Sequence, residues 1–307
     1  MMFVNSLKLF GSNWVKVLKF LLYYVVILGI SFALFLPVFF EFKEILSACH
    51  DMAVSTNSFN GVFQGALGQN LHSLIYTSWA LIVTAFSQNI GMAIYGIIVL
   101  AFFLPFLANV GKYTFYEMMY SYMTSKNEKG FFSAFAESLK KSVVFALVRT
   151  FYNMFFLCIA LLTIYALGMI SNPIFITYAL PFVVFIVLVA FFSLNQNMVL
   201  GWAPAMIVFD CNVFVGFRKG VKAVKRHFWS ILGTTTLYFV LFWLICLLFG
   251  VYPLVAIAPV MTVLLCVYNM VVFFTSQGMR FYVNGKHILT PKKLEEVDNI
   301  NKTAYIL

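Results

Sequence analysis

The sequence predicts an all-α integral membrane protein with six transmembrane helices, because of its composition, its apolar runs and the placement of its charges. Hydrophobic residues make up 63% of the 307 residues and charged residues 10%, against about 45–50% and about 25% in soluble domains. Runs of about 20 apolar residues, enough to cross the hydrocarbon core of a bilayer, recur along the chain. The net charge is +10. Because the basic residues adjoin the apolar runs, we expect anionic lipid headgroups as partners and no nucleic acid.

Six segments qualify as spans, and tight turns join two pairs of them. The predicted spans cover approximately 17–40, 90–111, 144–170, 174–195, 230–250 and 254–275. Ser171–Pro173 and Gly250–Pro253 are typical of the turns of helical hairpins. All Lys and Arg residues except Lys43 fall in or beside the loops of one side. By the positive-inside rule, both termini are predicted to be cytoplasmic.

The segment 43–88 is expected on the outer side, and its second part is ambiguous. Residues 62–88 place apolar side chains near helical spacing but interleave them with Gln, Asn, Ser and Thr. A seventh span here would break the parity that puts the basic loops on one side. Residues 62–88 are therefore predicted to form an amphipathic helix on the outer interface or a re-entrant segment. Tyr76 and Trp79 suit an interface.

Residues 1–275 are predicted to form a single membrane domain, and 276–307 a short cytoplasmic tail. Within the domain, three repeats of an interfacial helix plus two spans fit near 1–111, 126–208 and 213–275. The plainest interfacial helix is 214–229, where an apolar stripe faces a cationic side. Its expected contacts with lipid headgroups are Arg218, Lys219, Lys222, Lys225 and Arg226. The alternative stays open that any helix entering from the cytoplasm is basic and amphipathic.

In the tail, Asn284–Gly285 is a turn signal, and Thr290–Pro291 is typical of a helix start. A short helix is expected to follow through Val297.

Polar residues within the spans are the candidate ligand-binding site, since polar groups at membrane depth face the bundle interior or a wet cavity. The candidates are Arg149, Asn153, Asn195, Gln196, Asn197 and Asn269. Most lie toward the cytoplasmic ends of their helices, which predicts a cytoplasm-facing polar pocket suited to a lipid headgroup. The alternative is hydrogen bonding between helices, with Arg149 reaching the interface by its long stem.

No sequence motif supports an enzyme. The chain has no metalloprotease, serine-hydrolase, P-loop or dinucleotide-binding motif. An outer metal site could be formed by Glu44, Cys49, His50, Asp51 and His72, but their spacing does not require one. The five scattered cysteines do not form a disulfide framework. We therefore expect no catalytic residues, no metal and no cofactor.

Residues 202–232 resemble a known bacterial membrane-domain family. Trp202–Asp210 is similar to its stretch of Ala-Pro, an aliphatic run and an acid, while Phe217–Gly220 and His227–Gly233 occupy the places of the following helix and the entry to the next span. Met279–Gly285 resembles its basic exit after the last span. The family is the six-helix membrane domain of glycerophosphoryl diester phosphodiesterases and related stand-alone proteins.

The resemblance covers the last third of the chain, and the sequence departs from the family in two places. Asp210 stands for the usual Glu and Gly220 for the usual Ser. The resemblance implies a six-helix fold without an activity, because the phosphodiesterase chemistry of that family belongs to a separate soluble barrel.

These observations predict a non-enzymatic multi-pass protein of the bacterial cytoplasmic membrane. The expected role is a scaffold or accessory subunit linked to envelope or lipid processes, with a protein partner or a second copy of the chain as further partners. The alternative is a transporter or lipid-translocating protein that uses the polar pocket. A third hypothesis is that the protein is an intramembrane enzyme.

Overall fold

The computed structural model describes residues 2–47, 51, 66–125, 129–170, 172–225, 227–249, 252–279, 281–283 and 286–288. Nearly all of them are helical. The helices are α1 (Met2–Ser12), α2 (Trp14–Glu41), α5 (Ala66–Gln88), α6 (Ile90–Ile97), α7 (Leu104–Ser125), α8 (Phe131–Gly168), α9 (Leu180–Val199), α10 (Trp202–Val208), α11 (Val213–Lys225), α12 (Phe228–Phe249) and α13 (Tyr252–Gln277). Two π-helical segments are η1 (Ile98–Phe103) and η2 (Phe175–Ala179), and the strands are β1 (Phe281–Val283) and β2 (Lys286–Ile288).

Within the described residues, five helical stretches are long and apolar enough to cross a membrane. They are Trp14–Glu41, Ile90–Thr124, Phe131–Gly168, Leu180–Val208 and Ala258–Gln277. A shorter apolar stretch, Phe228–Phe242, belongs to α12. The chain is therefore a helical protein of membrane-spanning type.

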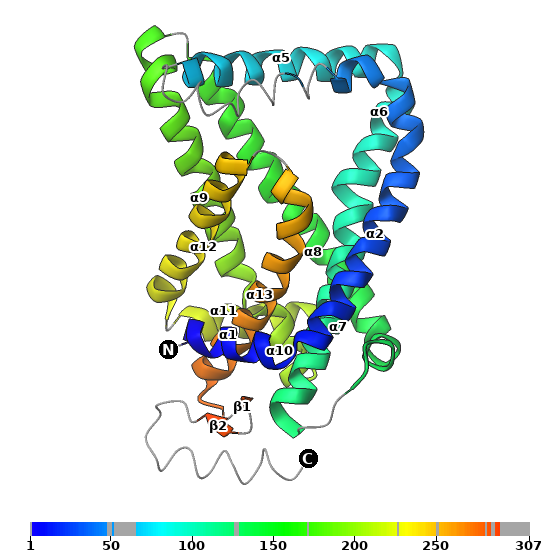
Figure 1. Ribbon diagram of the computed structural model, residues 1–307, viewed down its shortest axis with the longest axis vertical. Coiled ribbons are helices and arrows are strands. Elements are labelled where there is room, and N and C mark those ends of the chain that lie inside the picture. Colours follow the sequence, from blue (N-terminus) through cyan, green and yellow to red (C-terminus); the bar gives the residue numbers. More distant parts are fainter. Residues whose placement is uncertain are drawn as a thin grey trace.

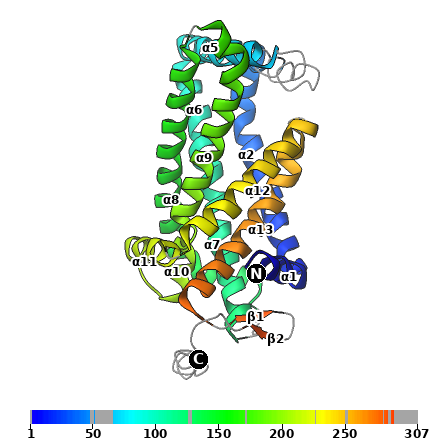
Figure 2. The ribbon, with the colours of Figure 1, turned by 90° about the vertical axis from the view of Figure 1, so that its left-hand side faces the viewer.

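Long helices run side by side along the molecule, and short helices lie across its ends (Figure 1). Helix α5 lies across one end, where it contacts α6, α8, α9 and η2. We call this the far end. Helices α1, α10 and α11 gather at the opposite end together with β1 and β2, as Figure 2 also shows. We call this the basic end, because Lys8, Lys16, Lys19 and the lysines of α11 belong to it.

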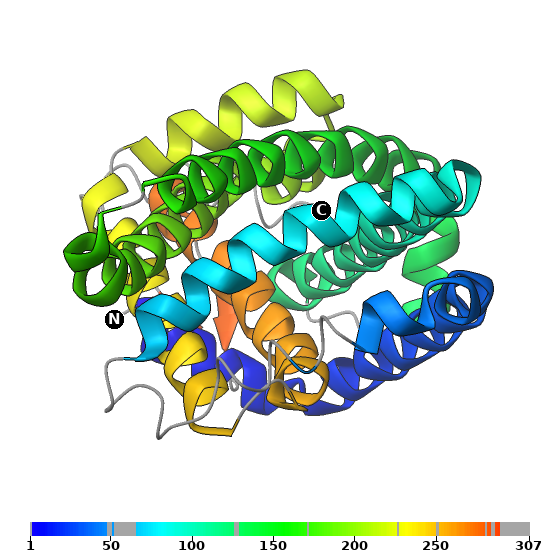
Figure 3. The same cartoon turned by 90° about the horizontal axis from the view of Figure 1, so that it is seen from above.

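Seen from above, α5 crosses over the ends of the other helices (Figure 3). The described part of the segment 62–88 is thus one helix, Ala66–Gln88, that lies across the ends of the longer helices. Trp79 packs on Tyr165 of α8 with ring centroids 5.0 Å apart. Gly168 lets Ile75 approach closely, because a Cβ there would lie 2.6 Å from Cγ2 of Ile75.

Proline explains both π-helical segments. Pro105 follows η1 by two residues, and Pro181 follows η2 by two residues. A proline lacks an N–H and its ring crowds the carbonyl four residues earlier, so the preceding turn widens. Helices α6, η1 and α7 nevertheless continue as one apolar stretch, and α13 likewise accommodates Pro259.

Two helices extend beyond their predicted spans. Helix α7 ends at Ser125, whereas the apolar run of the sequence predicts an end at 111. Helix α8 begins at Phe131, so the segment expected to be a separate interfacial helix is continuous with the span that follows it. Both extensions carry spanning helices into the basic end.

The most tightly packed part of the molecule lies at the basic end. Phe115, Met118 and Met119 of α7 are fully buried together with Phe273 and Phe274 of α13. Trp202 of α10 is buried in the same cluster, and its Nε1 donates a hydrogen bond to the Val213 carbonyl at 2.8 Å. The apolar surface removed from water or lipid at this end fixes the positions of α7, α10 and α13.

Helices α10 and α11 cross at two glycines. A Cβ on Gly220 would lie 2.5 Å from the carbonyl carbon of Gly201, and one on Gly201 would lie 2.7 Å from the carbonyl oxygen of Gly220. Only glycine permits this backbone contact. The contact bends the chain after α9 and holds α11 against the bundle.

The three predicted repeats contact one another in a cyclic order. Helix α1 packs on α13, α8 packs on α7, and α11 packs on α10 and α9. In each case, the first helix of one predicted repeat contacts a helix of another repeat that runs from the far end toward the basic end.

The short tail is partly described. Strands β1 and β2 pair antiparallel, with Val283 opposite Lys286, which agrees with the turn signal between them. The turn residues Asn284 and Gly285, and the helix expected after Thr290, lie outside the described residues.

Candidate functional site

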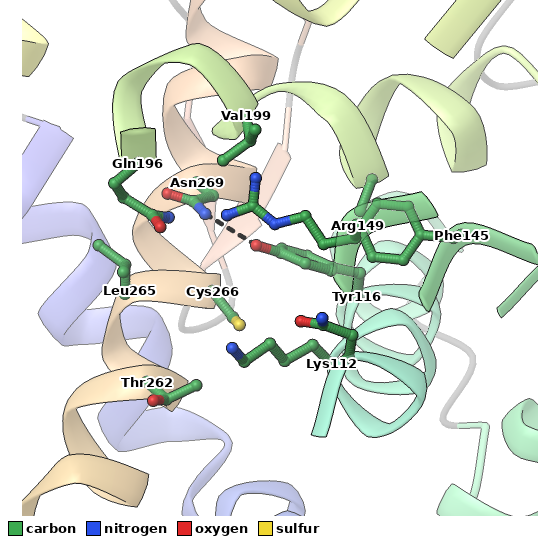
Figure 4. Close-up of a pocket in the computed structure, with 12 residues that line it drawn as sticks. Lys112, Tyr116, Phe145, Arg149, Gln196, Val199, Thr262, Leu265, Cys266 and Asn269 are labelled. Carbon is green, nitrogen blue, oxygen red and sulfur yellow. Dashed lines mark hydrogen bonds between the residues drawn. The ribbon is translucent and has the colours of Figure 1, made fainter. Parts of the chain in front are cut away.

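A polar cavity of about 70 Å³ lies between α7, α8, α9, α10 and α13, near the basic end (Figure 4). Helix α7 contributes Lys112 and Tyr116, α8 contributes Arg149, and α9 contributes Gln196. Helix α13 contributes Cys266 and Asn269. Helices α7, α9 and α13, which run toward the basic end, therefore meet at the cavity. Helix α8, which runs toward the far end, supplies the arginine.

Arg149 is the most deeply buried charged group of the cavity. It is 9% exposed, and its Cζ lies 5.4 Å from the ring centroid of Tyr152. Its Nη1 has no hydrogen-bond partner within the described part of the protein. Arg149 lies eight residues beyond Lys141, or about 12 Å of helix at 1.5 Å per residue. A guanidinium at this depth needs a partner, since an unpaired buried donor is costly.

Lys112 is the second cation of the cavity. It is half-buried, and Figure 4 shows its side chain directed toward Cys266 of α13. The charge of Arg149 acts on Lys112 and repels it, while no described carboxylate acts on either cation. Among the salt bridges between described residues, neither Lys112 nor Arg149 takes part in one. The cavity therefore has two like charges and no acid to balance them.

Hydrogen bonds between helices shape the walls. Asn269 of α13 donates from Nδ2 to the Tyr116 hydroxyl of α7 at 2.8 Å, and Asn109 of α7 donates from Nδ2 to Oγ1 of Thr150 of α8 at 3.2 Å. These bonds tie α7 to both neighbours. The Oδ1 atom of Asn269 has no partner among the described groups, so this amide also keeps an acceptor for a ligand or a water molecule.

The structure brings together three of the six residues predicted from the sequence. Arg149, Gln196 and Asn269 line the cavity. Asn153, Asn195 and Asn197 do not line it, although each has a buried side-chain oxygen without a described partner.

Sequence reasoning missed Lys112, because the second span was ended at the first cation after the apolar run. The residues that follow, Tyr113 to Met123, continue with aromatic and methionine side chains. That continuation was the available signal that the helix extends past Lys112 into protein.

The basic helix α11 has two distinct sides. Arg218, Lys219, Lys222 and Lys225 are exposed, as expected for headgroup contacts, and Nζ of Lys219 lies 4.3 Å from the Phe209 ring centroid. Arg226 lies outside the described residues.

The apolar stripe of α11 is partly buried against the rest of the protein and partly exposed. Val224 is buried, Phe217 is half-buried against the core, and Phe214 and Val221 are exposed. Gly216, Gly220 and Ala223 form most of the face that packs on the bundle. Only part of the stripe is therefore left to meet lipid.

The arrangement suits binding more than catalysis. Cations and amides converge on the cavity, but among its lining residues no carboxylate or histidine could act as a general base. Elsewhere in the described chain, no three His, Cys, Asp or Glu side chains gather closely enough to hold a metal ion. Cys49 and His50 lie outside the described residues.

Comparisons with known proteins give no assignment: no family model, no curated protein and no solved structure matches the chain.

Proposed function

We propose that this chain is a six-span protein of the bacterial cytoplasmic membrane that binds an anionic lipid headgroup in the cavity between α7, α8, α9 and α13. Helix α12 would supply the sixth span. Its 22 residues measure about 33 Å, enough for a hydrocarbon core of about 30 Å.

Charge distribution supports cytoplasmic termini. Lys129, Lys140 and Lys141 adjoin the start of α8, and Lys8, Lys16 and Lys19 adjoin α1 and α2, all toward the basic end. At the far end, the described chain carries Lys43 alone among Lys and Arg. The positive-inside rule then places the basic end in the cytoplasm.

Exposed aromatic and basic side chains support a membrane interface at the basic end. Phe132 of α8, Phe214 of α11 and Trp229 of α12 are largely exposed, and the cations of α11 are close to Phe214 in sequence. Large apolar side chains beside cations are typical of helices at the headgroup boundary. In this proposal, α1 and α11 lie in the cytoplasmic interface.

The observation that carries the binding function is the buried Arg149 without an acidic partner. A charge at membrane depth costs about 2.5–3.5 kcal/mol even on insertion scales, and an anion would offset this cost. The guanidinium fork matches phosphate oxygens. Since no carboxylate or histidine lines the cavity, we propose a non-enzymatic role as a scaffold or accessory subunit in lipid or envelope processes.

Substitution of Arg149 tests this function. In nanodiscs that contain anionic phospholipid, Arg149→Lys should lose most of the lipid-dependent rise in Tm, because an ammonium cannot form the two parallel bonds of the fork. The matched control is Arg218→Lys on the exposed face of α11, which should keep that rise. Equal lipid-dependent stabilisation of Arg149→Lys and the wild type would show that Arg149 only reaches the interface, and would refute the binding function.

Lipid translocation is the second candidate function. Helices α7, α9 and α13, which line the cavity, contain Pro105, Pro181 and Pro259, respectively. Prolines allow helices to bend. Movement of a labelled anionic lipid between the leaflets of proteoliposomes, absent in the Arg149→Lys variant, would favour this candidate over the scaffold.

The resemblance of residues 202–232 to the membrane domain of glycerophosphoryl diester phosphodiesterases remains a proposal about ancestry. It would be consistent with a lipid-related role, and it supplies no activity to this chain.

A further inference from the structure

We infer that the cavity binds a phosphate group with two negative charges, and that Lys112 and Arg149 neutralise it together. This inference rests on the proposed function and narrows the ligand to the phosphomonoester class.

The first support is the balance of charge. Two cations line the cavity, and no described carboxylate acts on either of them. A phosphodiester carries one negative charge and would leave one cation buried beside its like-charged neighbour. A phosphomonoester carries about −1.5 to −2 at pH 7 and balances both.

The second support is the direction of the two side chains. Figure 4 shows the guanidinium of Arg149 near Asn269 and Gln196, and the ammonium of Lys112 near Cys266, so both heads face the side where α13 passes. They come from different helices, α8 and α7. Figure 4 shows the Tyr116 side chain between the two heads, so a group that reaches both would lie beside the Tyr116 hydroxyl and receive the planar fork of arginine and the point charge of lysine at once. The unpartnered Nη1 of Arg149 supplies a donor for it.

The third support is size. A volume of about 10–15 Å³ on this scale holds one water molecule, so a cavity of about 70 Å³ has room for a group of a few heavy atoms. A phosphate group is of that size, and a sugar or nucleotide is larger. The cavity therefore fits the charged group itself, with any further part of the ligand outside.

Two sources could supply the same chemistry: a phospholipid whose headgroup is a phosphomonoester, and free inorganic phosphate. The depth of Arg149, about 12 Å of helix beyond Lys141, is within reach of a headgroup drawn between helices and of a small anion entering from the basic end.

The test compares ligands that differ in charge. The full-length protein is placed in phosphatidylcholine nanodiscs alone, with phosphatidic acid, with phosphatidylglycerol, or alone with inorganic phosphate in the buffer. Thermal unfolding and the lipids retained in native mass spectrometry are the readouts. Phosphatidic acid should bind at least about tenfold more tightly than phosphatidylglycerol, since one hydrogen bond to a charged group accounts for such a factor.

Lys112→Met identifies the lysine as the source of the preference, because methionine keeps a long unbranched stem without charge. This variant should bind phosphatidic acid about tenfold more weakly and prefer it no longer over phosphatidylglycerol. Lys112→Arg should keep the preference. Lys140→Met on the exposed face of α8, outside the cavity and outside the expected headgroup contacts of α11, is the matched control and should bind as the wild type does.

The outcomes separate the inference from the proposed function. Stabilisation by phosphatidic acid assigns the lipid source, stabilisation by inorganic phosphate alone assigns the free anion, and either supports a dianion. Equal binding of phosphatidic acid and phosphatidylglycerol, or unchanged binding by Lys112→Met, overturns the inference and leaves the proposed function intact. If no anionic lipid and no phosphate stabilises the wild type, both are wrong.

Discussion

The two ends of the molecule differ in how their side chains are packed. At the basic end, helices cross one another, glycine backbones touch, and Phe115 and Phe273 are fully buried. At the far end, α5 rests on the ends of longer helices, and Phe182 and Ile174 are 71% and 74% exposed. Both ends carry exposed large side chains, so the difference lies in the buried core: a large cluster that includes Phe115, Met118 and Phe273 at the basic end, against the small cluster of Val38, Phe42 and Ala93 described at the far end. The cavity lies beside the well-packed end, where neighbouring helices are held in place.

Truncation of a buried aromatic side chain at the basic end should cause the largest loss in the free energy of unfolding. Phe115→Ala removes a ring that packs on Phe20 with centroids 5.2 Å apart, and such a cavity costs about 3–5 kcal/mol. Unfolding in mixed detergent micelles should show that loss in the free energy of unfolding. Phe182→Ala, on the exposed surface of α9, should cost far less. Similar losses for both would mean that the two ends are equally packed.

The two close glycine contacts give a sharper comparison. Gly220→Ala places a Cβ against the backbone of Gly201, which cannot move without shifting a helix, so we expect a loss of about 1–3 kcal/mol. Gly168→Ala meets side-chain atoms of Ile75 instead of backbone, with Cγ2 at 2.6 Å and Cβ at 3.4 Å, and should lose less. The same unfolding measurement checks both, and a larger effect of Gly168→Ala would reverse the comparison.

At the far end, one cap joins two helices. Asn89 accepts a hydrogen bond from the Met92 amide at the start of α6, and its Nδ2 donates to Glu41 at the end of α2 at 3.0 Å. Asn89→Ala should cost about 1 kcal/mol, the usual value for a lost cap. Hydrogen exchange should rise in the first turn of α6 while α10 stays protected. Faster exchange throughout α10 as well would show that the two ends unfold together.

The smallest effect is expected from a surface ion pair at the basic end. Lys141 pairs with Asp210, and both side chains are exposed. Lys141→Met should change the free energy of unfolding by about 0–1 kcal/mol, and less at high salt. A loss comparable to that of Gly220→Ala would mean that this pair positions the turn between α10 and α11.

The apolar runs of the sequence correctly indicated the long helices, since hydropathy and length decide which segments can cross a bilayer. The same reasoning placed the ends of two helices wrongly. Because a cation normally marks the end of a span, Lys112 is predicted to lie beyond the second span, and the residues around Phe131 are predicted to form a separate interfacial helix. In this protein, α7 and α8 pack on one another past that point, and burial against protein permits helix to continue.

The candidate site was predictable in part for a related reason. Arg149, Gln196 and Asn269 stand out in the sequence because they are polar within apolar runs. Helical position decides whether such a residue faces the cavity, and Asn195 and Asn197 flank Gln196 but point elsewhere. Their directions depend on how α9 is rotated against its neighbours, which no single-helix pattern contains. The partnership of Lys112 with Arg149 depends on the contact between α7 and α8.

The packing of α1 on α13 has a consequence for the order in which the protein is made. Leu9 is fully buried and Ser6 is inaccessible, and both belong to α1, which is synthesised long before α13. Their partner α13 spans Tyr252–Gln277, so most of the membrane domain is synthesised between the two helices. Until α13 is made, the face of α1 that packs on it therefore stays uncovered, and the circle of helix contacts closes only when α13 arrives. A chain stalled before α13 would hold that face open to chaperones and proteases.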